Sequence, residues 1–446
     1  MTTRPVAGTP RAYRFPDIVR HRLANGLGVW LVPLAERELV SVQLLTDAGA
    51  AAEDEARGGV ASLTAQALVT GTRRLDATAF AETTEALGID VSSESSWDSA
   101  RAGFVALGEH LDAGTALLAE MVRTPRFDPG EFERLKSERL NEILQARADP
   151  ARLADESFLR QVYADGVPYG RLSAGAPDTV EALTVEDARA FHADRYAPNV
   201  TDVVIAGAID PDAAIAVVEA ELGDWRGSGP GHREVRPSVR GGRRVVLVDR
   251  PGSVQSELRV GHLGIDRRHP RYFPALVLGA LLGGVFRSRL NIRLREELGY
   301  TYGARASFDP RRAPGPFTAS AAVQTEVTVD AVRELLGQLQ RVREEAPPED
   351  ELREVRDFLV GVFPLRFETT AGIAAAIEPM AVYDLPDDWW QTYRSHLEAV
   401  GPAEVLEAAR ELVRPDDALI LVAGDASRLR EEVDAAGFGP VETASL

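Results

Sequence analysis

Two stretches of the chain, about 220 residues apart, share the same order of residue types. Residues 196–210 read YAPNVTDVVIAGAID, and residues 413–427 read VRPDDALILVAGDAS. Each places a proline and a polar turn before an apolar strand, which then runs into Ala-Gly and an aspartate. A repeat of this length constrains the fold strongly, because both halves of the chain must then form the same kind of domain.

The length and composition of the chain agree with two folded halves. Its 446 residues exceed one ordinary domain, and 45% hydrophobic with 27% charged residues is a globular composition. Each half mixes apolar strands with blocks of helical pattern, which predicts an α+β fold with helices packed on a sheet. The Gly-, Pro- and Arg-rich stretch 226–242 has no periodicity and predicts a linker between residues 1–225 and residues 243–446.

Local signals place several elements within the first half. Residues 26–34 and 40–49 are rich in Val, Leu and other apolar residues and predict strands. Residues 58–73, GGVASLTAQALVTGTR, predict a buried helix that runs into a Gly-Thr turn. Asp76 and Asp128 are predicted N-caps of the next helix and of a long later helix, which begins with a proline.

Net charge and residue usage exclude several classes of function. The net charge is −19, so nucleic acid is not an expected partner. The chain has no cysteine, which excludes disulfides, thiolate metal sites and cysteine nucleophiles. Residues 1–17 lack the apolar segment of a secretory signal, and the longest apolar run, residues 273–285, is too short to span a bilayer. We therefore expect a cytoplasmic protein without a membrane partner.

Common catalytic motifs are absent from the sequence. No two of the seven histidines lie three or four residues apart on one helix, so no zinc site is encoded locally, although a site built from distant histidines stays open. Gly-x-Ser-x-Gly is missing. The Gly-rich stretch 278–290 lacks the spacing of a phosphate-binding loop and favours helix packing. The histidines are His21, His110, His192, His232, His262, His269 and His396.

One segment, residues 286–304, contains many side chains that could bind a ligand. It reads FRSRLNIRLREELGYTYGA, with four arginines followed by two tyrosines around a glycine turn. Arginine offers planar donors for a carbonyl or carboxylate, and tyrosine offers one directed hydroxyl. Residue chemistry leaves two interpretations open. The segment either points these groups at a cleft, or forms a solvated helix with ion pairs to Glu296 and Glu297.

These segments resemble the pitrilysin/insulinase family of zinc peptidases, and most of all its short-subunit branch, which includes mitochondrial processing peptidase. The resemblance covers nearly the whole chain. It implies two homologous α+β domains, each a mainly antiparallel sheet with packed helices, that together form half of a clamshell. The matching stretches, in order, are LANGLGVWLVP, DAGAAAEDEARGGVA with LVTGT, FHADRYAPNVTDVVIAGAID and SRLNIRLREELGYTYGA.

The resemblance implies that the metal motif of the family is lost in this chain. Active members carry His-x-x-Glu-His on the helix before the Gly-Thr turn, where the histidines bind zinc and the glutamate is the general base. Here the motif falls on residues 62–66. Ser62 and Gln66 stand at the positions of the two histidines, and Ala65 stands at the position of the glutamate. Glu142, 76 residues after Gln66, matches the remaining ligand. One carboxylate cannot hold catalytic zinc, so we expect no metal and no cofactor in this chain.

The resemblance also implies a substrate-binding pair in the second half. Members carry an arginine and a tyrosine seven residues apart that hold the substrate backbone near the scissile bond. Arg295 and Tyr302 match this spacing and order. Arg293 and Tyr300 have the same spacing and form an alternative register.

Together these features imply a divided active site. In this branch of the family, one subunit supplies zinc and the other the Arg/Tyr pair, and the two close around a peptide. We therefore expect a non-catalytic, substrate-binding subunit whose homologous partner carries His-x-x-Glu-His and the zinc. The alternatives are a structural or peptide-binding relative, comparable to the core subunits of respiratory complexes, and a stand-alone hydrolase, for which no other set of catalytic residues is visible.

Overall fold

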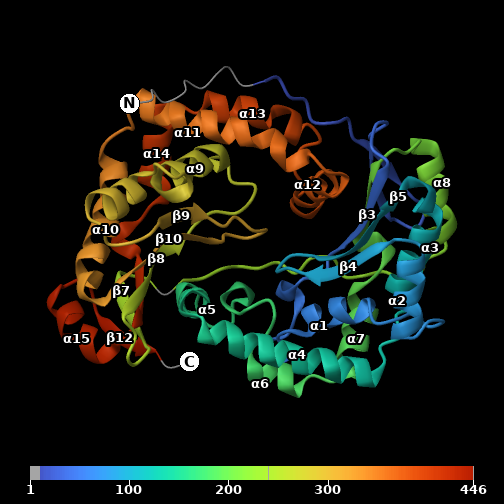
Figure 1. Ribbon diagram of the computed structural model, residues 1–446, viewed down its shortest axis with the longest axis horizontal. Coiled ribbons are helices and arrows are strands. Elements are labelled where there is room, and N and C mark those ends of the chain that lie inside the picture. Colours follow the sequence, from blue (N-terminus) through green and yellow to red (C-terminus); the bar gives the residue numbers. More distant parts are fainter. Residues whose placement is uncertain (1–10, 240, 445–446) are drawn as a thin grey trace.

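The computed structural model describes residues 11–239 and 241–444. Two lobes stand side by side, each a β-sheet with helices packed on it (Figure 1). The predicted α+β class with two domains is therefore confirmed. Residues 1–10, which belong to the stretch without an apolar signal, lie outside the described residues, as do residue 240 of the predicted linker and residues 445–446.

The first sheet has six strands in the order β1-β2-β6-β3-β5-β4. Only the neighbours β2 and β6 run parallel, and the other adjacent pairs are antiparallel. The edge strand β1 was not among the predicted elements. The strands are β1 (Val19–Arg22), β2 (Gly28–Pro33), β3 (Leu39–Thr46), β4 (Asp90–Ser95), β5 (Ala100–Leu107) and β6 (Thr201–Gly207).

The second sheet has the order β12-β7-β11-β8-β10-β9. Strand β7 runs parallel to both of its neighbours, and the remaining pairs are antiparallel. The strands are β7 (Arg244–Asp249), β8 (Gln255–Leu263), β9 (Ala304–Phe308), β10 (Pro316–Gln324), β11 (Leu419–Gly424) and β12 (Val441–Ala444).

The two sheets repeat one topology. Strands β2-β6-β3-β5-β4 and β7-β11-β8-β10-β9 have the same order and the same pattern of parallel and antiparallel pairs. Strands β6 and β11 are the apolar strands of the two similar sequence stretches. The repeat seen in the sequence is thus a repeat of structure, and only the outermost strands, β1 and β12, differ in direction.

Helices surround both sheets, and the predicted caps are present. Asp76 accepts a hydrogen bond from the backbone N–H of Ala79, and Asp128 accepts from Gly130. The helices of the first half are α1 (Val60–Leu68), α2 (Ala77–Ala86), α3 (Leu111–Arg123), α4 (Pro129–Ala148), α5 (Pro150–Val162), α6 (Pro177–Ala182), α7 (Val185–Arg195) and α8 (Pro211–Leu222). Those of the second half are α9 (Tyr272–Gly279), α10 (Thr328–Glu344), α11 (Glu349–Val362), α12 (Thr370–Tyr383), α13 (Trp389–Ala399), α14 (Pro402–Leu412) and α15 (Ala426–Ala435), with π-helical turns η6 (Ala280–Gly284) and η7 (Asn291–Glu297).

The central strands are buried on both faces. In β2, Val29 and Leu31 belong to the core shared with helices of the first half, whereas Trp30 and Val32 join a second core on the opposite face. Successive side chains of a strand point to opposite faces, so a continuous apolar run such as GVWLV requires cover on both sides.

Each sheet obtains this second cover from the other half of the chain. Helix α12 packs on β3 and β6 of the first sheet, and helix α5 packs on β8 and β11 of the second (Figure 1). Ile377 of α12 and Phe158 of α5 are almost fully buried in these contacts. The predicted domain boundaries, residues 1–225 and 243–446, remain a prediction. Each half contributes a helix to the core of the other, so the position in the sequence does not by itself separate two independent cores.

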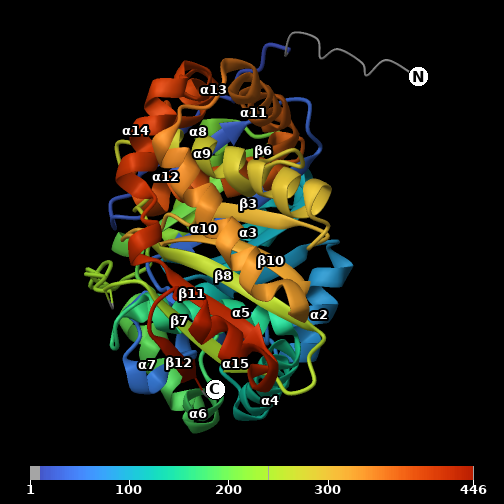
Figure 2. The ribbon, with the colours of Figure 1, turned by 90° about the vertical axis from the view of Figure 1, so that its left-hand side faces the viewer.

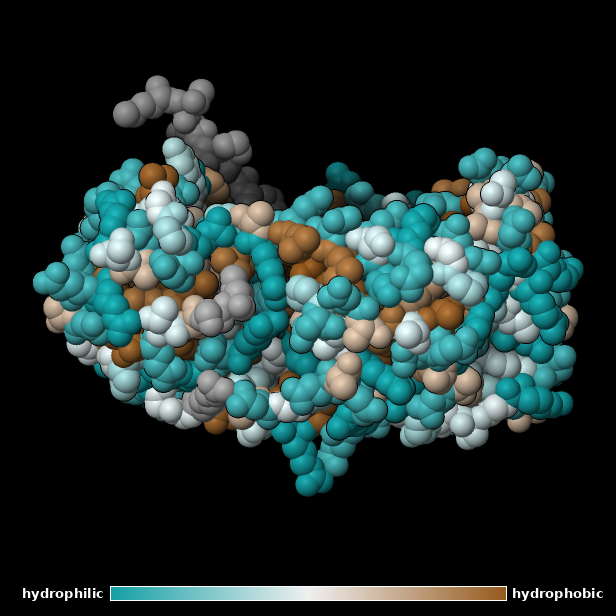
Figure 3. Space-filling view, turned by 90° about the horizontal axis from the view of Figure 1, so that it is seen from below, coloured by the Kyte–Doolittle hydropathy of each residue, from teal (hydrophilic) through white to brown (hydrophobic). Residues whose placement is uncertain are grey.

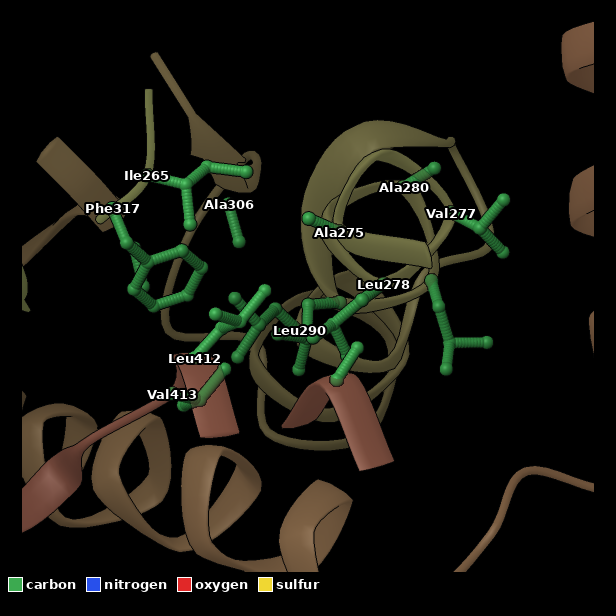
Figure 4. Packing of buried hydrophobic residues seen from close by; sticks show 14 of the residues in the cluster. Ile265, Ala275, Val277, Leu278, Ala280, Leu290, Ala306, Phe317, Leu412 and Val413 are labelled. Atoms are coloured by element: carbon green, nitrogen blue, oxygen red, sulfur yellow. The ribbon is translucent and has the colours of Figure 1, made fainter. Parts of the chain in front are cut away.

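The outer face of the second sheet is covered by its own helices. Helices α10 and α15 lie in front of the strands in Figure 2, and they contact β8, β10 and β7. The core beside them gathers Ala275 and Leu278 of α9 with Ala306 and Phe317 of the strands (Figure 4). The surface seen from below is mainly hydrophilic, with separate hydrophobic patches (Figure 3).

The Gly-rich stretch packs closely, as predicted. A Cβ atom added at Gly283 in η6 would lie 2.1 Å from the backbone nitrogen of Ala306 in β9. Only glycine allows the helical turn to approach the strand this closely.

Among the described residues, no single helix is long and apolar enough to cross a bilayer. One bent pair, Glu349–Phe367 with Thr370–Tyr383, meets the test together by length and composition alone, with an angle of 114° between its helices.

The exchanged helices generate a stability prediction. Phe158→Ala removes a ring that is 2% exposed and should lower the free energy of unfolding by about 3–5 kcal/mol, because the cavity lies between two halves of the chain. Leu144→Ala, at a side chain that is 61% exposed, is the control and should change it by no more than about 0.5 kcal/mol. Urea unfolding followed by circular dichroism measures both. Equal effects would show that α5 is not part of the core.

Candidate functional site

Helix α1, which carries the positions of the lost metal motif, is held at its start by a buried carboxylate. Gly59 precedes the helix with φ +97°, a conformation that favours glycine. The carboxylate of Glu53 accepts hydrogen bonds from the backbone N–H groups of Gly59, at 3.1 Å, and Ala61, at 2.8 Å. It thereby satisfies donors that a helix start leaves free.

Burial dominates the acidity of this carboxyl group. Glu53 is 3% exposed. Burial raises its pKa to about 7, although the hydrogen bonds from Ala61 and Gly59 and the charge of Arg171 act in the opposite direction. We therefore expect Glu53 to exchange its proton near neutral pH.

The positions of the family's zinc motif do not form a metal site. Ser62 and Ala65 are buried, Gln66 is half-buried and the side chain of Glu142 is 59% exposed. Zinc needs three or four nitrogen, sulfur or carboxylate ligands, and this set offers one carboxylate. Within the described residues, no group of three or more His, Asp or Glu side chains is placed to hold a metal ion. The site of distant histidines that the sequence left open finds no support there either.

Two of these positions nevertheless touch one side chain. Arg139 of α4 donates to the hydroxyl of Ser62 and pairs with Glu142. Sequence reasoning did not single out this arginine, although it lies three residues before Glu142 on the same helix.

The Arg/Tyr segment forms the π-helical turn η7 and the loop before β9. The backbone N–H of Leu298 bonds the carbonyl of Arg293, five residues back, and Gly299 ends the turn with φ +66°. Asn291 is 8% exposed, and its side-chain oxygen accepts from the backbone N–H of Ala304 at 2.8 Å. This bond fixes the loop that contains both tyrosines to the helical turn that contains both arginines.

Arg293 and Tyr300 are part of the fold of the second half. The guanidinium of Arg293 makes a two-pronged ion pair with Glu334, at 2.8 and 2.9 Å, and also pairs with Glu297 at 2.8 Å. Tyr300 is half-buried and packs against the core, and its backbone N–H bonds Leu294. Both side chains thus have structural partners.

Tyr302 is more open than Tyr300, whereas the Arg295 side chain, 36% exposed, differs from Arg293, 37% exposed, in its partners and not in its exposure. Tyr302 is 93% exposed. The guanidinium carbon of Arg295 lies 4.5 Å from the ring centre of Phe286, which is itself 69% exposed, and its Nε lies 3.5 Å from Glu296. In the described part of the chain, no carboxylate holds Arg295 in the two-pronged way that Glu334 holds Arg293. Arg295 and Tyr302 are therefore the pair with free hydrogen-bonding capacity.

A buried aspartate joins the two halves at the β9–β10 loop, which lies at the other end of β9 from Tyr302. Asp98 accepts a hydrogen bond from the hydroxyl of Tyr169 and another, at 3.0 Å, from the backbone N–H of Arg312 in the β9–β10 loop. The side chain of Arg312 also reaches Asp47 at 3.0 Å. Arg311, next to it, stacks 3.6 Å from the ring centre of Trp97. No local sequence signal indicated these contacts, which connect residues more than 70 positions apart.

The fold and the site define a two-domain, peptidase-like protein, and its described residues include no ligand set for a metal ion. Residues 31–173 match the insulinase family, peptidase family M16, and residues 182–359 match the domain described as the peptidase M16 inactive domain. The chain belongs to the M16 family, which confirms the resemblance found in the sequence. Its α1 lacks both histidines and the glutamate of the family's zinc motif, which agrees with the description of matching relatives as inactive or non-peptidase M16 proteins.

Among relatives of similar length, some are described as non-peptidase homologs and others as zinc proteases. A non-peptidase homolog of Helicobacter pylori is 24% identical over 373 residues, 82% of this chain and 84% of that protein. An uncharacterized zinc protease of Streptomyces coelicolor is 24% identical over 432 residues, 93% and 92% of the two chains. The solved structure of a peptidase M16 inactive domain from Pseudomonas fluorescens has a TM-score of 0.84 at 25% identity and covers 91% of this chain and 98% of its own.

The buried carboxyl group of Glu53 generates a pH prediction. Its pKa of about 7 exceeds the ordinary 4.5, so the folded protein keeps this proton to a higher pH than the unfolded chain. The resulting stabilisation is complete below about pH 4.5 and is lost as the pH rises through about 7, a change of about 3 kcal/mol. Glu53→Gln cannot ionise, so its stability relative to the wild type should increase from pH 5 to pH 8.

Urea unfolding at several pH values measures this difference. The same substitution at Glu55, an exposed carboxylate two residues away, is the matched control for the loss of a carboxylate in this segment. A difference for Glu53→Gln that does not change with pH contradicts the raised pKa.

Proposed function

We propose that this chain is the substrate-binding subunit of a two-chain zinc peptidase. In this proposal, a homologous partner with His-x-x-Glu-His on its own helix supplies the zinc, and the two subunits close as a clamshell around a peptide. The observation that carries the proposal is the contrast between the two arginines: Arg293 is held by Glu334 through two hydrogen bonds, whereas no carboxylate among the described residues holds Arg295 in this way, and Tyr302 is 93% exposed.

The chemistry of this pair suits a peptide backbone. The hydroxyl of Tyr302 donates one directed hydrogen bond, and the guanidinium of Arg295 presents several donors in one plane. Donors that hold the carbonyl groups next to the scissile bond orient the peptide and stabilise negative charge as it develops on oxygen. Activation of the attacking water is assigned to the partner's metal, since α1 has no ligand set for zinc.

The proposal is tested by reconstituting the two chains. The candidate partner is a His-x-x-Glu-His homolog, which we expect to be encoded beside this chain. Each chain and their mixture are assayed for zinc by mass spectrometry and for cleavage of fluorogenic peptides. We expect zinc only in the partner and cleavage only in the mixture. A stable complex that cleaves nothing, or no complex at all, would favour a structural or peptide-binding relative.

The register of the Arg/Tyr pair generates a mutational prediction for the active mixture. Arg295→Ala should lower kcat by about 10²–10³-fold, because a donor to the developing oxyanion is lost. Tyr302→Phe should lower it by about tenfold or more, because one hydrogen bond to the substrate is lost. Tyr302→Phe should keep the thermal stability of the wild type, because Tyr302 is 93% exposed, and Arg295→Ala should come close to it, because the residue loses only its stacking on the exposed ring of Phe286 and its 3.5 Å contact with Glu296.

Arg293→Ala is the matched control for register. It should retain most of the activity and lose stability, because it leaves Glu334 without its partner. If Arg293→Ala abolishes turnover while Arg295→Ala does not, the register is Arg293/Tyr300.

A further inference from the structure

A single guanidinium group connects helices α1 and α4 beside the lost metal motif. Nη2 of Arg139 donates to the hydroxyl oxygen of Ser62 at 3.1 Å. Nη1 of the same side chain lies 2.8 Å from a carboxylate oxygen of Glu142. Ser62 and Glu142 are the positions that match the first and the last metal ligand of active relatives. The two positions are thus joined by an arginine instead of a metal ion.

The side chain of Arg139 is largely buried between helices α1 and α4. Its side chain is 14% exposed, and Ser62, its partner on α1, is 8% exposed. A charged group this far from water is stabilised only when opposite charge and hydrogen-bond acceptors surround it. Glu142 supplies the charge and Ser62 supplies an acceptor. The Nε atom is buried and has no hydrogen-bond partner within the described residues.

The same position cannot hold this guanidinium and a zinc ion together. Zinc binds its ligands at about 2.0–2.2 Å, so its donors must converge on one point. The guanidinium already uses the carboxylate of Glu142 and carries a fixed positive charge that does not dissociate at any ordinary pH. A dication placed between Ser62 and Glu142 would compete for that carboxylate and be repelled by Arg139.

We infer that Arg139 is an internal cation that takes the place of the metal, holds α1 against α4 and closes this site to zinc. Loss of the motif histidines is then only part of the reason that the site is unfit for metal. Restoring the ligands without removing Arg139 does not restore metal binding. This inference concerns the chain alone and does not depend on the proposed two-chain peptidase.

Rebuilt metal ligands test the inference directly. Ser62→His/Gln66→His restores the two missing histidine ligands and keeps Ala65, which is fully buried and stands at the position of the general base, not of a metal ligand. The same double variant is made with Arg139→Ala added. Zinc content after dialysis is measured by mass spectrometry, zinc affinity by competition with a chelating dye, and coordination by the visible absorption of bound Co²⁺.

We expect the double variant to retain little zinc and the triple variant to bind about one zinc per chain, with an affinity at least about 100-fold higher. Arg134→Ala in the double variant is the matched control. Arg134 lies on the same helix, is 49% exposed and pairs with Glu131 and Glu138. It should not raise the zinc affinity.

Two results would overturn the inference. One is a double variant that binds zinc as tightly as the triple variant. The other is a folded triple variant that binds no better than the Arg134 control. Circular dichroism and thermal melting confirm folding for each protein. In the unaltered background, Arg139→Ala should lower the melting temperature more than Arg134→Ala does, and an equal or smaller decrease would also contradict the role of Arg139 between the helices.

Discussion

The contact on which the rest of the structure depends is the exchange of helices α5 and α12 between the two halves. Each sheet has central strands that are apolar on both faces, and its own helices cover only one face. Burial of apolar surface is worth about 25 cal/mol per Å², so a sheet left without its second layer would lose much of its stability. The two halves therefore stabilise each other, and the lobes of the molecule are held in one relative position.

Because the two halves are held in one relative position, helix α1 and the Arg/Tyr segment, the two parts of the candidate site, are also fixed relative to each other. The loop between β9 and β10 is tied to the first half through Asp98, and Tyr302 lies just before β9. In the first half, α1 carries the positions of the lost metal motif, and Glu53 caps its start. In the second half the donors of Arg295 and Tyr302 are open.

Sequence reasoning reached the candidate site only in part. The spacing of seven residues fits both Arg293/Tyr300 and Arg295/Tyr302, because spacing carries no information about which arginine has another partner. That partner is Glu334, 41 residues further along the chain. In the same way, the sequence identified Ser62 as an altered motif position and Glu142 as the one remaining ligand position. The role of Arg139 became visible only in the packing of α1 against α4.

The sequence by itself determined the repeat, the α+β class, the helix caps at Asp76 and Asp128, and the loss of the metal motif. These features depend on periodicity, on residues within one turn of each other, or on which residue stands at a given position. The tertiary structure alone decided which helix covers each sheet and which charges meet. An apolar strand shows that it needs cover on both faces, but any apolar helix satisfies that need, and the choice between them is made by contacts across more than 100 residues.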